Sequence, residues 1–256
     1  MFNRERSYTT DAIVLDRRPY GEADRILIVF TPQYGRLDLI AKGASKTKSR
    51  FGPYLDLCSW VRLDLATGRD LDVVRSAEPV RRFPNLGTDL NRYCHASYLI
   101  ELVKTLTQVD EPHAGIFDLL SRSLVLLDEG VDPWVITRHF EMALLNELGY
   151  RPQLFRCVGC DEEIQATTNA FSASLGGLLC ANDRDLDPLA TPLSVNAQKY
   201  LRVMQRDGLA AVARLAPSER ERAEIQKVTE SYARYVADKD LRSLRSMQEI
   251  CAVHGL

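Results

Sequence analysis

Residues 60–65 read WVRLDL, in which apolar and polar side chains alternate. Alternation of this kind predicts a strand with one buried and one exposed face. Four more short β-rich segments share this part of the chain, at residues 10–15, 25–30, 37–40 and 71–74. Turn-forming sequences separate them, the first of which is Pro19-Tyr20-Gly21-Glu22. Five short strands without an intervening helical pattern predict a small β-barrel or sandwich.

The apolar period changes after Pro84, where helical spacing begins. Apolar stripes predict helices over residues 90–106 and 116–127, with Gly130 at the C-terminal end of the second. A third helix, over residues 132–148, is indicated by its capping residues. Residues 150–190 interrupt the helical pattern, which resumes near Ser194, and Ser218-x-x-Glu221 predicts a capping box. The chain is therefore expected to be an α+β protein.

Composition and charge narrow the class of protein. Of the 256 residues, 45% are hydrophobic and 27% charged, which is ordinary for a globular protein and argues against disorder as the main state. The absence of a long apolar run or an apolar leader predicts a cytoplasmic protein. Residues 1–82 hold 15 Lys and Arg against 11 Asp and Glu, whereas the rest holds 18 against 24. A basic N-terminal third suggests a local site for a polyanion.

A cluster of cysteines follows the third helix. Cys157 and Cys160 are two residues apart, and after 19 more residues come Cys180 and Asp183 with the same gap. A gap of two lets both thiolates reach one tetrahedral ion, so the spacing favours zinc, with Asp183 as an unusual fourth ligand. The alternative is a degenerate knuckle that folds without metal. Thiol–disulfide exchange is less favoured, because such cysteines usually begin a helix, whereas these follow one.

The segment KGASKTKSR, residues 42–50, contains four cations and no acid. It lies between the third and fourth predicted strands, which indicates an exposed loop able to contact phosphates. The cations are Lys42, Lys46, Lys48 and Arg50. Tyr34, Phe51 and Tyr54 lie close by in the sequence and could stack on unpaired bases. The alternative is a solvated loop that only keeps the protein soluble.

No catalytic signature stands out. The four histidines lack partners at metal or triad spacing, and no phosphate loop, nucleophile elbow or paired carboxylates occur. This weighs against an enzyme.

An ordered set of short motifs spans almost the whole chain. The motifs are Thr10–Leu15, Tyr20–Ile26, Thr31–Arg36, Ala41–Ala44, His139–Tyr150, Cys157–Cys160 and Leu241–Ser246. The set resembles the RecO family of bacterial DNA recombination and repair proteins. The resemblance implies an OB-fold DNA-binding domain over residues 1–82, a helical domain over 83–150, a zinc-finger-like module over 151–190, and C-terminal helices over 191–256 that pack on the helical domain.

The family resemblance also implies a function. Such proteins bind single- and double-stranded DNA and anneal complementary strands. Together with RecR they help to load RecA onto DNA covered by single-stranded DNA-binding protein (SSB), whose acidic tail is expected to bind the helical or C-terminal region. They are not known as catalysts. Where they bind a metal, its usual ligands are four cysteines, so Asp183 departs from the pattern.

We therefore predict a non-enzymatic DNA-binding and strand-annealing factor located at the nucleoid. The predicted DNA contacts are Arg36, Lys42, Lys46, Lys48, Arg50 and Tyr34, and the predicted zinc ligands are Cys157, Cys160, Cys180 and Asp183. Stacking and phosphate contacts should make binding independent of base sequence. Two alternatives are a thiol- or metal-dependent enzyme and an RNA-binding OB-fold protein.

Overall fold

The computed structural model describes residues 6–212, 214 and 216–246. The chain divides into two compact units, one containing residues 1–131 with 242–256 and the other residues 132–241. Among the described residues, no helix combines the length and apolarity needed to cross a membrane.

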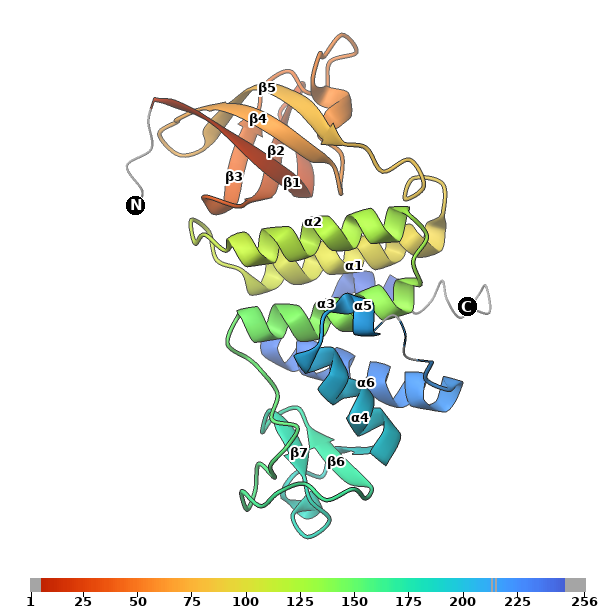
Figure 1. Ribbon diagram of the computed structural model, residues 1–256. Helices are drawn as coiled ribbons and strands as arrows, with labels where there is room; N and C mark the ends of the chain where they lie inside the picture. Colours follow the sequence, from red (N-terminus) through yellow and green to blue (C-terminus); the bar gives the residue numbers. More distant parts are fainter. Residues whose placement is uncertain (1–5, 213, 215, 247–256) are drawn as a thin grey trace. The chain divides into compact units, whose positions relative to one another are not determined.

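The first unit contains a closed five-stranded barrel (Figure 1). Its strands are β1 (Ser7–Tyr20), β2 (Asp24–Thr31), β3 (Gly35–Ala41), β4 (Trp60–Ala66) and β5 (Asp72–Arg81). The strand order is β1-β2-β3-β5-β4, and only the short pairing of β3 with β5 is parallel. This arrangement confirms the expected OB-fold barrel. The 3₁₀ turn η1 (Gly52–Tyr54) lies in the connection between β3 and β4.

Alternating side chains build the barrel core. In β3, Leu37 and Leu39 are buried while Asp38 and Ile40 are only partly covered. The core also includes fully buried residues of β1, β2 and β4, among them Val14, Leu27, Val29 and Leu63. Each strand thus turns one face inward, as the period of two requires.

Two strands are longer than the sequence pattern indicated. β1 continues through Pro19 and Tyr20, because the chain reverses only at Gly21, whose φ of +60° suits a tight turn. β5 continues to Arg81 rather than ending at Val74, because its pairing with β4 runs from Val73 to Arg81. Pro79 is tolerated there because the register shifts beside it, so one ladder hydrogen bond is already lost.

Two helices complete the first unit, α1 (Leu90–Leu106) and α2 (Ala114–Asp128). The carboxylate of Asp89 caps α1 by accepting a hydrogen bond from the Arg92 N–H. Gly130 has a φ of +90° just after α2, as predicted for a helix end. The apolar stripe of α1 is not buried over its whole length, because Leu90 and Tyr93 are 52% and 39% exposed. They lie in the first turn, where the rest of the unit does not cover the helix.

The second unit combines helices with a small sheet. Its helices are α3 (Pro133–Glu147), α4 (Val195–Arg206), α5 (Leu209–Val212) and α6 (Glu219–Ala237). A three-stranded sheet in the order β7-β6-β8 follows α3 in the chain, with strands β6 (Asn169–Ser172), β7 (Gly177–Leu179) and β8 (Thr191–Leu193) and the 3₁₀ turn η2 (Arg184–Leu186). β6 and β7 form an antiparallel hairpin that ends directly before Cys180.

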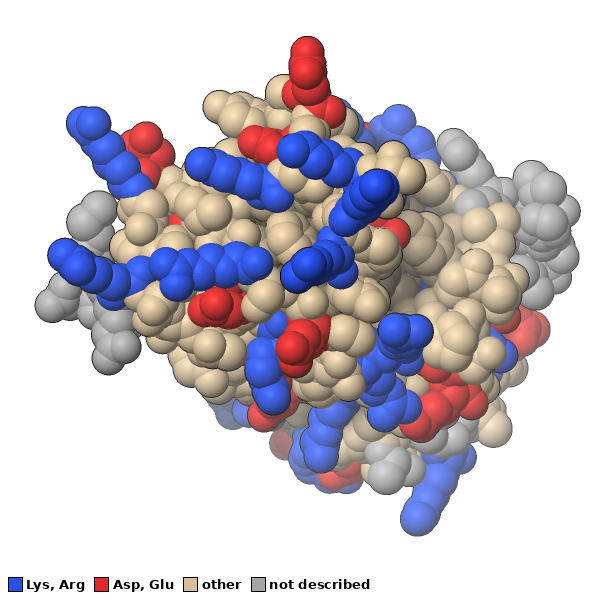
Figure 2. Space-filling view, turned by 90° about the horizontal axis from the view of Figure 1, so that it is seen from above, with Lys and Arg blue, Asp and Glu red and all other residues tan. Residues whose placement is uncertain are grey.

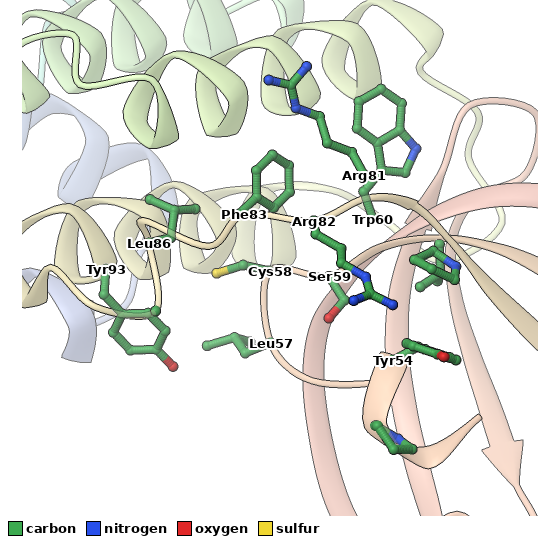
Figure 3. A pocket seen from close by; sticks show the side chains of 14 residues that line it. Tyr54, Leu57, Cys58, Ser59, Trp60, Arg81, Arg82, Phe83, Leu86 and Tyr93 are labelled. Carbon is green, nitrogen blue, oxygen red and sulfur yellow. The ribbon is translucent and has the colours of Figure 1, made fainter. Parts of the chain in front are cut away.

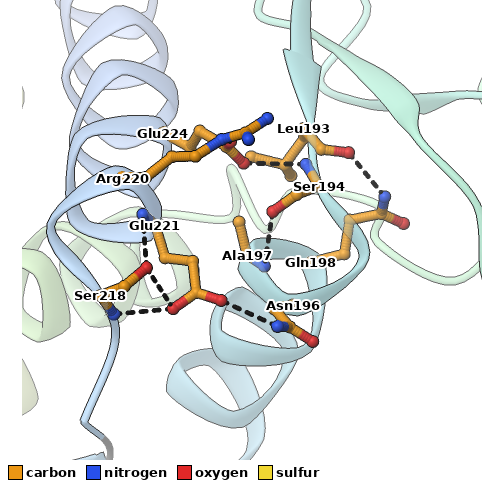
Figure 4. A network of polar contacts seen from close by, with 9 residues as sticks. All are labelled: Leu193, Ser194, Asn196, Ala197, Gln198, Ser218, Arg220, Glu221 and Glu224. Carbon is orange, nitrogen blue, oxygen red and sulfur yellow. Dashed lines mark hydrogen bonds and ion pairs between the residues drawn. The ribbon is translucent and has the colours of Figure 1, made fainter.

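The helix ends of the second unit form a polar network (Figure 4). Ser218 and Glu221 make the predicted capping box at the start of α6. The Asn196 side chain of α4 donates to the Glu221 carboxylate at 2.8 Å, and the Ser194 N–H donates to Glu224 at 2.9 Å. The starts of α4 and α6 are therefore joined directly.

The compact units do not follow the four-part division expected from the sequence. α1 and α2 group with the barrel, whereas α3 groups with the sheet and α4–α6. The domain boundaries at residues 82, 150 and 190 stay a prediction.

Candidate nucleic-acid interface and metal site

Four of the predicted cations gather along one groove of the barrel. Residues of the segment from Lys42 to Phe51 and residues 75–78 of β5 line a groove of about 450 Å³. The lining cations are Lys42, Lys46, Lys48, Arg50 and Arg75. Glu78 is the one carboxylate among the lining residues. Figure 2, a view from above, shows Lys and Arg side chains projecting from this end of the molecule with fewer acidic side chains between them.

Hydrogen bonds fix the backbone of this basic segment to the start of β2. The Gly43 N–H donates to the Asp24 carboxylate at 2.7 Å, and the Ser45 N–H donates to the Ala23 carbonyl at 2.8 Å. The Arg25 side chain donates to the Ser45 hydroxyl at 3.2 Å. The segment is therefore an ordered platform that carries exposed cations.

Arg75 was missed by the sequence reasoning, because the last strand was expected to end at Val74. In the structure β5 continues, with Val74 buried and Arg75 exposed. Parallel pairing of Leu39 with Asp72 and of Ile40 with Val73 carries β5 past the end of β3, where the basic segment begins. Alternation stops after Val74, because Arg75 and Ser76 are both polar and exposed, so the sequence offered no local signal that the strand continues.

Arg36 lies away from this groove. Its guanidinium Nη1 donates to the Lys104 carbonyl at 2.6 Å and to the Thr107 carbonyl at 2.8 Å. These carbonyls belong to the C-terminal end of α1, which lacks its own hydrogen-bond donors. Arg36 is near the start of β3, whereas Lys42 follows its end. The observed contacts of Arg36 join the barrel to α1.

The aromatic side chains named from the sequence occupy different places. Tyr34 packs against the barrel core and contacts Tyr8 in a tilted arrangement, with ring centroids 4.8 Å apart and an angle of 59° between the rings. Phe51 lines the basic groove, and Tyr54 lines a neighbouring pocket. The structure thus brings Phe51, but not Tyr34, to the cations.

The second candidate site is the cysteine cluster of the second unit. The four ligand atoms of Cys157, Cys160, Cys180 and Asp183 all lie within 4.8 Å of one another. The Cys160 and Cys180 sulfurs are 3.9 Å apart, and Asp183 Oδ2 is 3.1 Å from the Cys157 sulfur and 3.4 Å from that of Cys180. Thiolates at about 2.3 Å from a tetrahedral zinc ion lie about 3.8 Å from each other, so the distances fit a metal site.

The backbone around the cluster supports this interpretation. The N–H groups of Gly159 and Cys180 donate to the Cys157 sulfur at 3.4 and 3.3 Å. A Cβ atom at Gly159 would lie 2.9 Å from Asp183 Oδ2 and 2.7 Å from Leu186 Cδ1. A side chain at Gly159 would therefore force the Asp183 or Leu186 side chain to shift, and Asp183 is one of the four ligand residues.

The titration of the thiols couples metal binding to protons. The hydrogen bond with the Asp183 carboxylate raises the pKa of the Cys160 thiol to about 12. Burial acts to raise the pKa of Cys157, but backbone N–H donors, first that of Cys180, outweigh it and the pKa lies below its ordinary value. A metal ion must displace the proton of Cys160, so low pH opposes binding. Four protein ligands would leave no open position, which suits a structural ion.

Comparisons with known proteins extend over both units. Residues 5–83 match the family model described as Recombination protein O N terminal, and residues 87–245 match Recombination protein O C terminal. A DNA repair protein RecO of Roseiflexus sp. (strain RS-1) is 37% identical over 96% of this chain and 87% of its own length. The DNA repair protein RecO of Pelotomaculum thermopropionicum is 37% identical over 92% of this chain and 91% of its own length. That of Dehalococcoides mccartyi (strain CBDB1) is 32% identical over 93% of this chain and 93% of its own length.

These relatives are DNA repair proteins, and the matches run through both the barrel and the cysteine cluster. The chain belongs to the RecO family. The family predicted from the ordered motifs is thereby confirmed.

Proposed function

We propose that this protein binds single- and double-stranded DNA through the basic groove of its OB-fold and anneals complementary strands without catalysing bond chemistry. Two DNA strands repel each other through their phosphates, and a protein that neutralises phosphates on both reduces that repulsion. The proposal rests on the groove itself, whose lining residues include five cations and one carboxylate. DNA repair as the role of the family agrees with it.

Binding through this groove should not depend on base sequence. Lysine and arginine side chains that contact phosphates position the nucleic acid but carry no sequence information. Lys46, Lys48 and Arg50 are exposed on the ordered platform, where they can reach successive phosphates. The same argument serves single and double strands, because both present a row of phosphates.

The salt dependence of DNA binding tests the proposal. Each cation that neutralises a phosphate of a single strand contributes about 0.7 to the slope of log affinity against log salt concentration. The triple variant Lys46→Ala, Lys48→Ala and Arg50→Ala should flatten the slope by up to about two, for every base sequence alike. Annealing of complementary strands should slow in parallel.

A control variant removes the same charge elsewhere. Lys199, Lys227 and Arg234 are exposed on helices of the second unit, and their replacement by alanine should leave the slope nearly unchanged. Equal flattening of the salt slope in both triple variants would mean that only the net charge of the protein matters. An unchanged slope in the groove variant would mean that residues 42–50 form a solvated loop that does not contact DNA.

Protein partners belong to the same proposal. The protein would act with RecR to help RecA load onto SSB-coated DNA at the nucleoid, and the acidic tail of SSB would bind the helical or C-terminal region. Truncated SSB without its tail should then fail to bind in a pull-down assay. Equal binding of full-length and truncated SSB would contradict this assignment.

A further inference from the structure

A second hollow lies beside the basic groove within the first unit. It has a volume of about 380 Å³, within the usual range for small-ligand sites. Its lining residues include four aromatic residues and two arginines (Figure 3), namely Tyr54, Trp60, Phe83, Tyr93, Arg81 and Arg82. We refer to this hollow as the aromatic pocket.

The basic groove and the aromatic pocket share two stretches of chain, and the pocket is also lined by the start of β4 and by residues between Phe83 and Tyr93. The connection from β3 to β4 lines the groove with residues up to Phe51 and the pocket from Pro53 onward. β5 lines the groove as far as Glu78 and the pocket from Pro79 onward. A polymer that follows the groove along β5 therefore reaches the pocket next.

The side chains of the pocket suit a nucleotide. The Arg82 guanidinium lies over the Tyr54 ring, 5.8 Å from its centroid, on the barrel side of the pocket (Figure 3). Arg81 is paired with Glu129 at 2.8 Å, whereas Arg82 is exposed and forms no ion pair within the described part of the chain. Aromatic rings stack on bases of any identity, and a guanidinium pairs with phosphate, so the two groups match the two parts of one nucleotide.

One wall of the pocket is held in a fixed conformation. Cys58 is buried and adopts a φ of +67°, which is unfavourable for a residue with a side chain. Its N–H donates to the Val14 carbonyl at 3.1 Å, and the Val14 N–H donates to the Ser59 carbonyl at 3.0 Å. β1 thus imposes this conformation on residues 58 and 59. Backbone held in this way tends to occur at binding sites, and a prepared wall lowers the entropy cost of binding.

We propose that the aromatic pocket receives one unpaired nucleobase of single-stranded DNA, with its phosphate against Arg82 and the adjoining phosphates in the basic groove. This inference rests on the proposed DNA binding and assigns to it a site that distinguishes strands. Bases of an intact duplex are stacked inside the helix and cannot enter, so the pocket favours single over double strands.

The experiment uses oligonucleotides that carry 2-aminopurine, whose fluorescence falls when the base stacks on an aromatic ring. Binding of the full-length protein to a labelled single strand should quench the fluorescence. Tyr54→Leu keeps an apolar side chain but removes the ring, and should abolish the quenching. Loss of one stacked base should lower single-strand affinity by between about fivefold and 150-fold, and so lower the ratio of single-strand to duplex affinity.

A second variant guards against a folding defect in the first, because Tyr54 also packs on the barrel core. Arg82 is exposed, so Arg82→Ala should fold normally and should reduce single-strand affinity more than duplex affinity. Lys199→Ala serves as the matched control, with the same loss of charge on an exposed helix of the second unit.

The outcomes separate this inference from the proposed function. If the groove triple variant flattens the salt slope but Tyr54→Leu and Arg82→Ala leave both quenching and affinity ratio unchanged, DNA binding stands and the pocket proposal is wrong. If the unaltered protein binds no DNA, both are wrong. If Arg82→Ala abolishes binding of the acidic SSB tail while quenching persists, the pocket holds an acidic peptide and not a base.

Discussion

The carboxylate of Asp24, at the start of β2, accepts a hydrogen bond of 2.7 Å from the backbone N–H of Gly43, the second residue of the basic segment. Gly43 has a φ of +69°, so the chain turns there out of β3 and into the cations. An acidic side chain beneath a basic segment opposes phosphate binding by its charge. Its contribution here is to hold the backbone that positions Lys42 and Lys46.

Two substitutions separate the effect of the Asp24 hydrogen bond from the effect of the Asp24 charge. Asp24→Asn and Asp24→Ala both remove the charge, but only asparagine keeps an oxygen that can accept from Gly43. Asp24→Ala should therefore lower the urea midpoint, with a loss of about 1 kcal/mol relative to Asp24→Asn, and should bind single-stranded DNA more weakly than Asp24→Asn. Equal stability and equal affinity of the two variants would show that the hydrogen bond does not organise the segment.

Arg36 provides a contrasting prediction, because its contacts are internal. Arg36→Ala removes the donor for two carbonyls at the end of α1 and should lower the free energy of unfolding by about 2 kcal/mol or more. The salt slope of DNA binding should stay unchanged, measured at a temperature where the variant is folded. Arg36→Lys keeps the charge, but its ammonium nitrogen lies one bond nearer the backbone than Nη1, so it should also be destabilised. A flatter salt slope of DNA binding in Arg36→Ala would show that Arg36 contacts DNA after all.

Local signals accounted for much of the fold. The barrel strands follow from alternation, and the starts of α3 and α6 follow from Asp132 and Ser218, whose side chains cap the N–H groups a few residues on. The cysteine cluster could also be foreseen, because the two-residue gaps and the β6–β7 hairpin are local features. Such features depend on residues close in sequence.

The remaining features depend on pairing between distant segments. The position of Arg75 beside the basic segment requires the parallel register of β3 and β5, which no local pattern specifies. The contact of Arg36 with α1 joins residues about 70 positions apart, as the separations of 68 and 71 show. The aromatic pocket likewise combines the β3–β4 connection, the end of β5 and the Tyr93 side chain of α1. Tertiary structure, rather than composition, brings these groups together.

The metal site gives a prediction that does not involve DNA. Protein purified without chelator should contain about one zinc ion per chain, bound by three thiolates and Asp183. Asp183→Cys should retain zinc more tightly in competition with a chelator, because it completes a four-thiolate site, and Cys160→Ser should weaken zinc binding and lower the unfolding temperature. A clearly substoichiometric metal content in the unaltered protein would contradict the site.

Gly159 tests the same site through its shape. Gly159→Ala places a methyl group against Asp183 and Leu186, and should weaken zinc binding by about tenfold or more. Gly208→Ala is the matched control, because nothing lies within 4 Å of the added atom. Equal zinc affinities of the two variants would mean that the knuckle is less closely packed than the distances indicate.

The capping box of α6 predicts a dependence of stability on pH. Hydrogen bonds from the Ser218 backbone, the Asn196 side chain and the Ser218 hydroxyl hold the pKa of Glu221 below its ordinary value of 4.5 (Figure 4). A carboxyl with a depressed pKa in the folded state stabilises the fold above the unfolded pKa, and this contribution disappears as the pH falls through the folded pKa.

Glu221→Gln keeps an oxygen acceptor at the third helical position but does not titrate. The unaltered protein should therefore unfold at a higher temperature than Glu221→Gln at pH 7, and the gap should narrow towards pH 3, where protonated Glu221 resembles glutamine. Glu219→Gln removes a first-turn carboxylate that is not part of the network, and its gap should change less with pH. Thermal unfolding followed by circular dichroism measures both gaps, and a Glu221→Gln gap that stays constant from pH 7 to pH 3 would show that the network does not bind the ionised carboxylate preferentially.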